Sequence, residues 1–298
     1  MARAGMTPPG LQRRWCVILV FIICVFPGLA FANETPVTFQ SRNGDILQAI
    51  YAPPRSGAPA PAVLIMHGCG GLFTKSGKIK SRERAWLALF QAEGWAVLMP
   101  DSFGSRGARG SQCKVKKRVA NEDDLRPLDA AGALKFLSTR PEIDPTRIVI
   151  AGWSNGAMTT LYTVREGSPA APEPGMQDFR AALMFYPGCS TINKAYSDYR
   201  SRIPALIQHG AADDWTLAAP CVDLVKAANR RGSALMEIDS YEGAYHGFDH
   251  PTSRVHQVET RSSSTASGLR TVHVGGDPHV REKAIARTIG WLRQQLSQ

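Results

Sequence analysis

Residues 147–164 read Arg-Ile-Val-Ile-Ala-Gly-Trp-Ser-Asn-Gly-Ala-Met-Thr-Thr-Leu-Tyr-Thr-Val. The apolar run Arg147–Ala151 is typical of a strand buried on both faces of a parallel sheet. A helical pattern follows from Ala157 to Val164. The segment between them has the form Gly-x-Ser-x-Gly, which holds a serine hydroxyl up at the carboxyl end of a sheet when it joins a strand to a helix. This context predicts that Ser154 is a nucleophile, the alternative being an ordinary glycine-rich turn.

Further short apolar runs predict the rest of the sheet. Expected buried strands are Ala62–Met66, Trp95–Met99, Ala181–Tyr186 and Ala205–Gln208, with a further candidate at Ala234–Tyr241. Two earlier strands, Val37–Gln40 and Ile46–Tyr51, are expected to pair through a turn at Asn43-Gly44. Expected helices are Arg82–Glu93, Leu125–Leu137, Val222–Arg230 and Ile285–Leu296. This alternation predicts the α/β class, with a doubly wound, mostly parallel sheet flanked by helices on both faces. The polar stretch Thr260–Gly268 is expected to be an exposed loop.

A serine nucleophile needs a base, and the base needs a carboxylate that orients it. In the strand-to-helix arrangement these partners follow the serine in the order Asp, then His. Asp213 and Asp214 come after the expected strand Ala205–Gln208, and His246 comes after the candidate strand Ala234–Tyr241. The chain order therefore favours Ser154, Asp213 and His246 as a catalytic triad.

Other acidic and histidine side chains compete for these roles. Asp214 could instead cap the following helix, and Asp101 lies at the correct edge of the sheet but precedes the serine in the chain. His209 ends a strand and is expected to be packed or hydrogen-bonded. His250 follows His246 by four residues, whereas solvent exposure is the expectation for His256, His273 and His279.

Backbone N–H groups are also needed to stabilise a tetrahedral intermediate. One donor is expected from Asn155, directly after the nucleophile. The second is expected from the glycine-rich segment His67-Gly-Cys-Gly-Gly71, where glycines allow close approach of the backbone to a substrate. The Cys69 N–H is the favoured second donor, with Gly70 as the alternative.

The N-terminus has the pattern of a secretory signal peptide. Two arginines precede the apolar run Trp15–Phe26, and small residues stand at Ala30 and Ala32. The run is far shorter than the roughly 20 residues that span a bilayer, so a retained membrane anchor is the weaker reading. We therefore expect residues 1–32 to be cleaved, residues 33–298 to form one domain, and the protein to be exported to the periplasm or secreted.

Export changes the interpretation of the cysteines. The even number that remains, Cys69, Cys113, Cys189 and Cys221, suggests two disulfides in an oxidising compartment, with three pairings possible. Pairs Cys69–Cys113 and Cys189–Cys221 are favoured because each would join neighbouring loops of the expected fold. No two cysteines have the Cys-x-x-Cys spacing of a zinc hook, so no metal and no cofactor are expected.

The net charge of +10 falls to +7 when Arg3, Arg13 and Arg14 leave with the signal peptide. A basic surface of this size favours anionic substrates or a negatively charged envelope. The one dense basic run, Lys114–Arg118, has no interleaved aromatic residues on which bases could stack. Nucleic-acid binding is therefore not expected.

From about Val37 to Leu296 the chain resembles the dienelactone hydrolase family of the α/β-hydrolase superfamily, specifically its exported members with a serine nucleophile. The resemblance rests on His67-Gly-Cys-Gly-Gly71, Pro100-Asp-Ser-Phe103, Gly152-Trp-Ser-Asn-Gly156, Gly210-Ala-Ala-Asp213 and His246-Gly-Phe248. It implies the triad Ser154, Asp213 and His246, and the choice of Asp213 over Asp214 rests on it. The type enzymes differ in having a cysteine nucleophile and a glutamate where this chain has Gly68-Cys69.

The resemblance also implies substrate contacts. Two family arginines hold a substrate carboxylate; the first corresponds to Arg106, and His250 stands at the place of the second. Trp153 is the third expected contact. Hydrolysis of a small carboxylic ester or lactone through an acylated Ser154 is the resulting hypothesis. A serine peptidase of the prolyl-oligopeptidase type and a binding protein without enzymatic activity are the alternatives.

Overall fold

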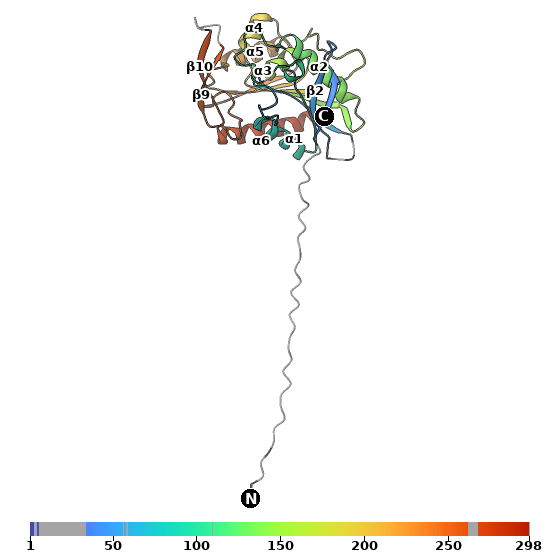
Figure 1. Ribbon diagram of the computed structural model, residues 1–298, viewed down its shortest axis with the longest axis vertical. Coiled ribbons are helices and arrows are strands. Elements are labelled where there is room, and N and C mark those ends of the chain that lie inside the picture. Colours follow the sequence, from blue (N-terminus) through green and yellow to red (C-terminus); the bar gives the residue numbers. More distant parts are fainter. Residues whose placement is uncertain are drawn as a thin grey trace. The chain divides into compact units, whose positions relative to one another are not determined.

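The computed structural model describes residues 34–55, 57, 59–108, 110–261 and 268–297, together with 1, 2 and 5. Contacts within the chain divide it into two units, Met1–Phe31 and Ala32–Gln298. The predicted signal peptide, residues 1–32, lies almost entirely outside the described residues. The catalytic candidates all belong to the second unit, which is shown in Figure 1.

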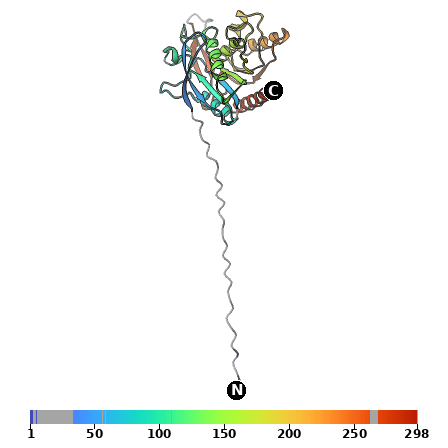
Figure 2. The same ribbon diagram turned by 90° about the vertical axis from the view of Figure 1, so that its right-hand side faces the viewer.

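An eight-stranded sheet forms the centre of this unit, with the strand order β1-β2-β4-β3-β5-β6-β7-β8. Its strands are β1 (Thr35–Gln40), β2 (Ile46–Ala52), β3 (Ala60–Met66), β4 (Ala96–Pro100), β5 (Ile143–Trp153), β6 (Ala181–Phe185), β7 (Ala205–Gly210) and β8 (Met236–Tyr241). Strands β3 to β8 run parallel, whereas β2 pairs antiparallel with both β1 and β4. In Figure 2 the blue early strands and the orange segments near β8 lie on opposite sides of the unit, as this order requires.

Helices cover both faces of the sheet (Figure 1). They are α1 (Ser81–Ala92), α2 (Leu125–Ser138), α3 (Asn155–Val164), α4 (Cys189–Ala195), α5 (Ala219–Arg230) and α6 (Pro278–Leu296), with a short 3-10 turn η1 (Gly104–Arg106). Side chains that alternate along β3 enter two cores: Leu64 belongs to the core that also contains residues of α2, α3 and α5, and Val63 belongs to the core that also contains residues of α1 and α6. This two-layer burial explains why the central strands read as unbroken apolar runs. The predicted α/β class with its mostly parallel sheet is confirmed.

The region after β8 differs from the sequence prediction. Residues His256–Arg261 (β9) and Leu269–Val274 (β10) form an antiparallel hairpin, where only a polar loop over Thr260–Gly268 had been expected. Residues 262–267 of that stretch lie outside the described part. The hairpin is hard to predict from the sequence because each strand has a single buried position, Thr260 in β9 and Val272 in β10, and polar side chains surround both. This hairpin forms part of the candidate site.

Among the residues that the structure describes, no helix is both long enough and apolar enough to cross a membrane. Within the same residues there is no group of three or more His, Cys, Asp or Glu side chains that could hold a metal ion.

Candidate active site

Ser154 lies at a sharp turn between β5 and α3, with φ 54° and ψ −114°. A positive φ is unfavourable for a residue with a side chain and is tolerated where the surroundings enforce it. Close packing enforces it here. A Cβ on Gly152 would lie 2.2 Å from the Gly156 carbonyl oxygen, and a Cβ on Gly156 would lie 2.0 Å from that of Met66. Both glycines of the Gly-x-Ser-x-Gly segment are therefore required by the turn.

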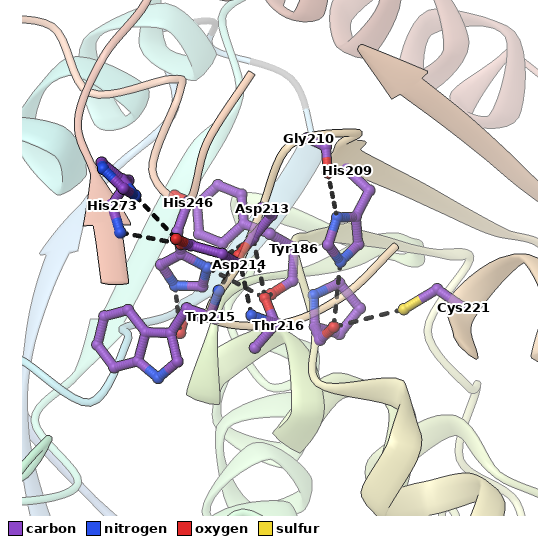
Figure 3. A network of polar contacts seen from close by, with 12 residues as sticks. Tyr186, His209, Gly210, Asp213, Asp214, Trp215, Thr216, Cys221, His246 and His273 are labelled. Atoms are coloured by element: carbon purple, nitrogen blue, oxygen red, sulfur yellow. Dashed lines mark hydrogen bonds and ion pairs between the residues drawn. The ribbon is translucent and has the colours of Figure 1, made fainter. Parts of the chain in front are cut away.

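His246 links the serine to a buried carboxylate. Its Nε2 lies 2.9 Å from Ser154 Oγ, and its Nδ1 lies 2.8 Å from Asp213 Oδ2. His246 and Asp213 are 5% and 2% exposed, so little water competes for these contacts. Figure 3 shows His246 beside Asp213, with the Trp215 side chain on one side of its ring. The loops after β5, β7 and β8 bring these groups together because the carboxyl ends of parallel strands share one edge of the sheet.

Asp213 is held as an anion by its surroundings. Burial raises the pKa of its carboxyl, but the neighbouring His246 and the hydrogen bonds it receives outweigh burial, so its pKa lies below the ordinary 3.8. The backbone N–H groups of Trp215 and Thr216 both donate to Oδ1 at 2.9 Å. The Thr216 hydroxyl lies 3.0 Å from Oδ2. Asp213 thus presents one oxygen to the backbone and the other to the histidine.

This low pKa leads to an expected pH profile. Because the pKa of Asp213 lies below 3.8, the acid side of log kcat/KM should show no second protonation step from this carboxyl above pH 4. Its slope should then be one, a tenfold loss per pH unit, until the protein unfolds. Initial rates of p-nitrophenyl acetate hydrolysis in constant-ionic-strength buffers measure this. A slope of two above pH 4 would contradict an ionised Asp213.

The neighbouring carboxylate, Asp214, has a different role in the structure. Its Oδ2 lies 2.8 Å from His273 Nδ1, and its Oδ1 accepts the His273 backbone N–H at 2.9 Å. It therefore ties β10 to the loop after β7 rather than capping a helix. The Gly275 N–H donates to the His246 carbonyl at 2.9 Å, which fixes the hairpin to the histidine loop as well.

The other histidine and aspartate candidates lie apart from the contacts that join Ser154, His246 and Asp213. His209 is buried, with Nε2 facing the Pro187 carbonyl oxygen at 3.3 Å, as expected of a packed residue. Asp101 lies 4.0 Å from His67 Nε2 on the other side of β3 from the serine strand. His279 is exposed. His256 is exposed, as expected, and it also lines the pocket described next.

A cavity of about 530 Å³ opens over Ser154 and His246. Its wall combines the segment Gly68–Gly70, the loop near Cys113, the residues around His250 and the β9–β10 hairpin, including Val258 and Val274. The segment Gly68–Gly70 is close to the nucleophile: a Cβ on Gly68 would lie 3.8 Å from Ser154 Cβ. This places the segment that carries Cys69 beside the serine.

The structure corrects two of the three expected substrate contacts. The Arg106 guanidinium donates to Asp129 at 2.8 and 2.9 Å and to Asp45 at 2.8 Å, and it does not line the cavity. Trp153 is 1% exposed, and its indole N–H donates to Asp249 at 2.7 Å inside the core. Arg106 is therefore bound by two carboxylates of the protein itself, and Trp153 is buried where no substrate reaches it. His250 does line the cavity.

Two cations that sequence reasoning missed, Lys80 and Arg82, line the cavity from the start of α1. Lys80 Nζ donates to the Gly70 carbonyl at 2.5 Å, and Arg82 Nη1 donates to the Tyr186 hydroxyl at 3.2 Å. Burial lowers the pKa of Lys80. Nothing in the local pattern of α1 distinguishes these residues from solvent-exposed basic side chains, because their position depends on how α1 meets the loop after β3.

Asp249, also missed, is fully buried behind the histidine. It accepts hydrogen bonds from the indoles of Trp86 and Trp153, each at 2.7 Å, and from the Tyr186 hydroxyl at 2.5 Å. The Tyr186 ring lies 4.5 Å from the His246 ring, centre to centre. This set of contacts supports one side of the imidazole.

Both favoured disulfides are present, Cys69–Cys113 and Cys189–Cys221. The first joins the segment beside the serine to a loop of the cavity wall, whereas the second joins α4 to α5.

These positions predict different effects for the two bridges. Each closes a loop, of 44 and 32 residues, so chain entropy suggests that losing either one costs about 3–4 kcal/mol of unfolding free energy. Only the double variant Cys69→Ser/Cys113→Ser should also lower kcat, by about tenfold, because it frees the segment that carries Cys69. Urea unfolding and ester kinetics, with Cys189→Ser/Cys221→Ser as the matched control, measure both effects. Equal loss of kcat in the two double variants would sink this assignment.

The dienelactone hydrolase family model matches residues 47–296. Among solved structures, a dienelactone hydrolase-like promiscuous phosphotriesterase from metagenomic libraries has 17% identity and a TM-score of 0.59, covering 89% of this chain and 99% of that one. Esterase 2 of Thermogutta terrifontis, phosphoramylated by tabun, has 16% identity and a TM-score of 0.60, covering 88% and 94%. Dipeptidyl peptidase 4 of Porphyromonas gingivalis has 17% identity and a TM-score of 0.53, covering 72% of this chain but 33% of that one. At these identities the structural likenesses establish the fold alone.

Proposed function

Because this chain belongs to the dienelactone hydrolase family, we propose that it is a serine hydrolase that cleaves small carboxylic esters or lactones through an acyl-enzyme on Ser154. Family membership makes it a hydrolase of carboxylic ester bonds. The observation that carries the finer proposal is the continuous contact from Ser154 Oγ through His246 to Asp213 at the floor of an open cavity.

The geometry supports a two-step reaction. His246 Nε2 accepts the Ser154 proton as the oxygen attacks the ester carbonyl, and the same proton passes to the leaving alcohol when the carbon–oxygen bond breaks. Water then enters, gives a proton to His246 and attacks the acyl carbon, after which Ser154 leaves and regains its proton. Asp213 stays ionised throughout and keeps Nδ1 protonated, so that Nε2 is the free acceptor. For a lactone, the leaving alcohol remains part of the acyl chain.

Charge that develops on the carbonyl oxygen needs donors already in place. We propose the backbone N–H groups of Asn155 and Cys69 for this oxyanion hole. Their support is positional: Asn155 follows the nucleophile at the first residue of α3, and Cys69 lies beside Gly68 on the cavity wall. Two such donors each contribute on the order of 3 kcal/mol to transition-state stabilisation in other serine hydrolases.

The substrate proposal follows from the cavity walls. Three cations of the wall, Lys80, Arg82 and Lys114, outnumber its two carboxylates, Glu83 and Glu259, although Glu83 pairs with Arg82 at 2.6 Å. Val258 and Val274 of the hairpin give another side apolar surface. An acyl or alcohol group that carries a carboxylate would suit this combination. His250, which lines the same cavity and lies 3.3 Å from Ser81 Oγ, is proposed as a further substrate contact.

Export is part of the proposal, and two disulfides support it because such bonds persist in oxidising compartments. The mature enzyme would be periplasmic or secreted, without a membrane anchor, and would need neither metal nor cofactor for the steps above. A serine peptidase activity remains the alternative, but the structural likeness to dipeptidyl peptidase 4 of Porphyromonas gingivalis covers only 33% of that protein.

The test uses the purified protein and a fluorophosphonate probe, which modifies activated serines; tabun modification of the similar esterase makes this reagent a suitable choice. We expect labelling at Ser154 and turnover of p-nitrophenyl esters and lactones with short acyl groups. Turnover of a dipeptide p-nitroanilide in preference to esters would favour the peptidase alternative. Absence of both turnover and labelling would favour a binding protein that has kept the fold.

A further inference from the structure

Arg126, at the second position of α2, is fully buried directly behind the nucleophile turn. Its Nη1 donates to the side-chain oxygen of Asn155, and its Nη2 donates to the His67 carbonyl at 2.7 Å. These two acceptors belong to the two segments that carry the proposed oxyanion donors. One is the residue that follows Ser154, and the other begins the segment that leads to Gly68 and Cys69.

The two segments are already in contact, and Arg126 joins them from behind. A Cβ on Gly156 would lie 2.7 Å from the same His67 carbonyl oxygen, so the start of α3 packs directly against the end of β3. The Asn155 amide is held from its other end as well, because its Nδ2 donates to Glu122 at 2.7 Å. The planar guanidinium, with donors in a fixed fork, sets the spacing of two acceptors in a way that a flexible ammonium does not.

The charge of Arg126 is unusual for its surroundings. Within the described residues no carboxylate oxygen lies within 4.0 Å of its guanidinium, and the Phe103 ring lies 5.1 Å from its central carbon. Burial lowers the pKa of Arg126 to about 10, so the group stays charged near neutrality. Asp129 and Glu122 lie beyond ion-pair distance but partly stabilise the charge electrostatically. A buried charge without a direct ion-pair partner is costly to maintain. A positive charge close to the site where an oxyanion forms would stabilise that oxyanion, because electrostatic attraction is strong where water is excluded.

We infer that Arg126 is a positioning residue for the oxyanion hole, which fixes the Asn155 and Cys69 segments relative to each other and adds positive charge behind them. The inference rests on the proposed function. Arg126 itself is 0% exposed and does not line the cavity, so it touches no substrate. It acts through the backbone groups of its neighbours.

This role predicts a specific kinetic change. Arg126→Met keeps a long side chain but removes the charge and both hydrogen bonds; we expect kcat for p-nitrophenyl acetate to fall about 100-fold, comparable to the loss of one oxyanion donor. KM should stay within threefold, because ground-state binding in the cavity is unchanged. Arg126→Lys, which restores the charge and one donor, should recover about tenfold of the lost kcat.

Arg202 provides the matched control. It also donates to two backbone carbonyls, those of Thr163 and Arg165, but it pairs with Asp178 and lies outside the cavity. Arg202→Met should therefore lower stability without lowering kcat. A purely structural role for Arg126 would make the two methionine variants alike, with kcat per folded molecule unchanged in both.

A second variant covers the case in which Arg126→Met does not fold. Asn155→Ala removes the side chain that Arg126 holds but keeps the backbone N–H, and it should lower kcat about tenfold. Combined with Arg126→Lys, its effect should be less than additive, since both changes break the same contact.

The outcomes separate the two proposals. Suppose that the wild type turns over esters and is labelled, but Arg126→Met keeps kcat within threefold of the wild type. The positioning role is then wrong and the proposed hydrolase function stands. If Arg126→Met does not fold, the same conclusion follows when both Arg126→Lys and Asn155→Ala keep kcat within threefold. If the wild type shows neither turnover nor labelling, the proposed function itself fails.

Discussion

Replacing Ser154 by alanine is expected to lower kcat for p-nitrophenyl acetate by about 10⁴- to 10⁶-fold. The reaction depends on a covalent bond to Ser154 Oγ, the only hydroxyl oxygen that the described residues place against His246 Nε2. Without it, water would have to be positioned and deprotonated in the same space, and the oxyanion hole and substrate binding would supply the residual rate. Fluorophosphonate labelling should disappear together with turnover.

Folding must be shown to be unaffected in this variant. Alanine keeps the strained backbone conformation and loses one side-chain hydrogen bond, so the urea midpoint should move by an amount equivalent to about 1 kcal/mol or less. Ser138→Ala, at the end of α2, removes a serine hydroxyl that donates to the Leu134 carbonyl and serves as the matched control. Full activity in Ser154→Ala would disprove the acyl-enzyme mechanism whatever the fate of the control.

The nucleophile turn could be predicted from sequence because its causes are local. A buried strand, two glycines at places where a Cβ would collide with backbone, and a following helix all lie within residues 147–164. The loops that carry Asp213 and His246 could also be predicted, because parallel strands deliver successive loops to the same edge of a sheet. Chain order then sufficed to select these candidates.

Contacts that depend on distant segments could not be predicted in this way. Arg106 was placed on the correct edge, but Asp45 and Asp129, which lie 61 and 23 positions away in the chain, bind its guanidinium. The α1 cations and Arg126 are ordinary basic residues in sequence and become distinctive only through what packs against them. Their roles depend on the relative placement of α1, α2 and the loop after β3, which no local pattern encodes.

Asp213→Asn is expected to lower kcat by about 10⁴-fold at neutral pH, through the histidine tautomer rather than through lost packing. The Trp215 and Thr216 N–H groups both point at Oδ1, so the asparagine must place its carbonyl oxygen there. Its NH₂ group then faces His246 Nδ1 and requires that nitrogen to accept. The ring proton moves to Nε2, where it faces Ser154 Oγ and prevents the imidazole from acting as a base.

Asp214→Asn is the matched control, since Asp214 is adjacent in sequence but bonds to His273 on the hairpin. Asparagine can still accept the His273 backbone N–H through its carbonyl oxygen. We therefore expect kcat to stay within threefold, while KM for bulky acyl groups can change as β10 loosens. Steady-state kinetics of the two variants on the same ester, with thermal unfolding to confirm folding, makes the comparison direct. Similar losses of kcat in both variants would mean that Asp213 only supports the structure of this loop, and Asp213 would no longer count as a member of the triad. A loss confined to Asp213→Asn follows only if Asp213 Oδ2 sets the tautomer of His246.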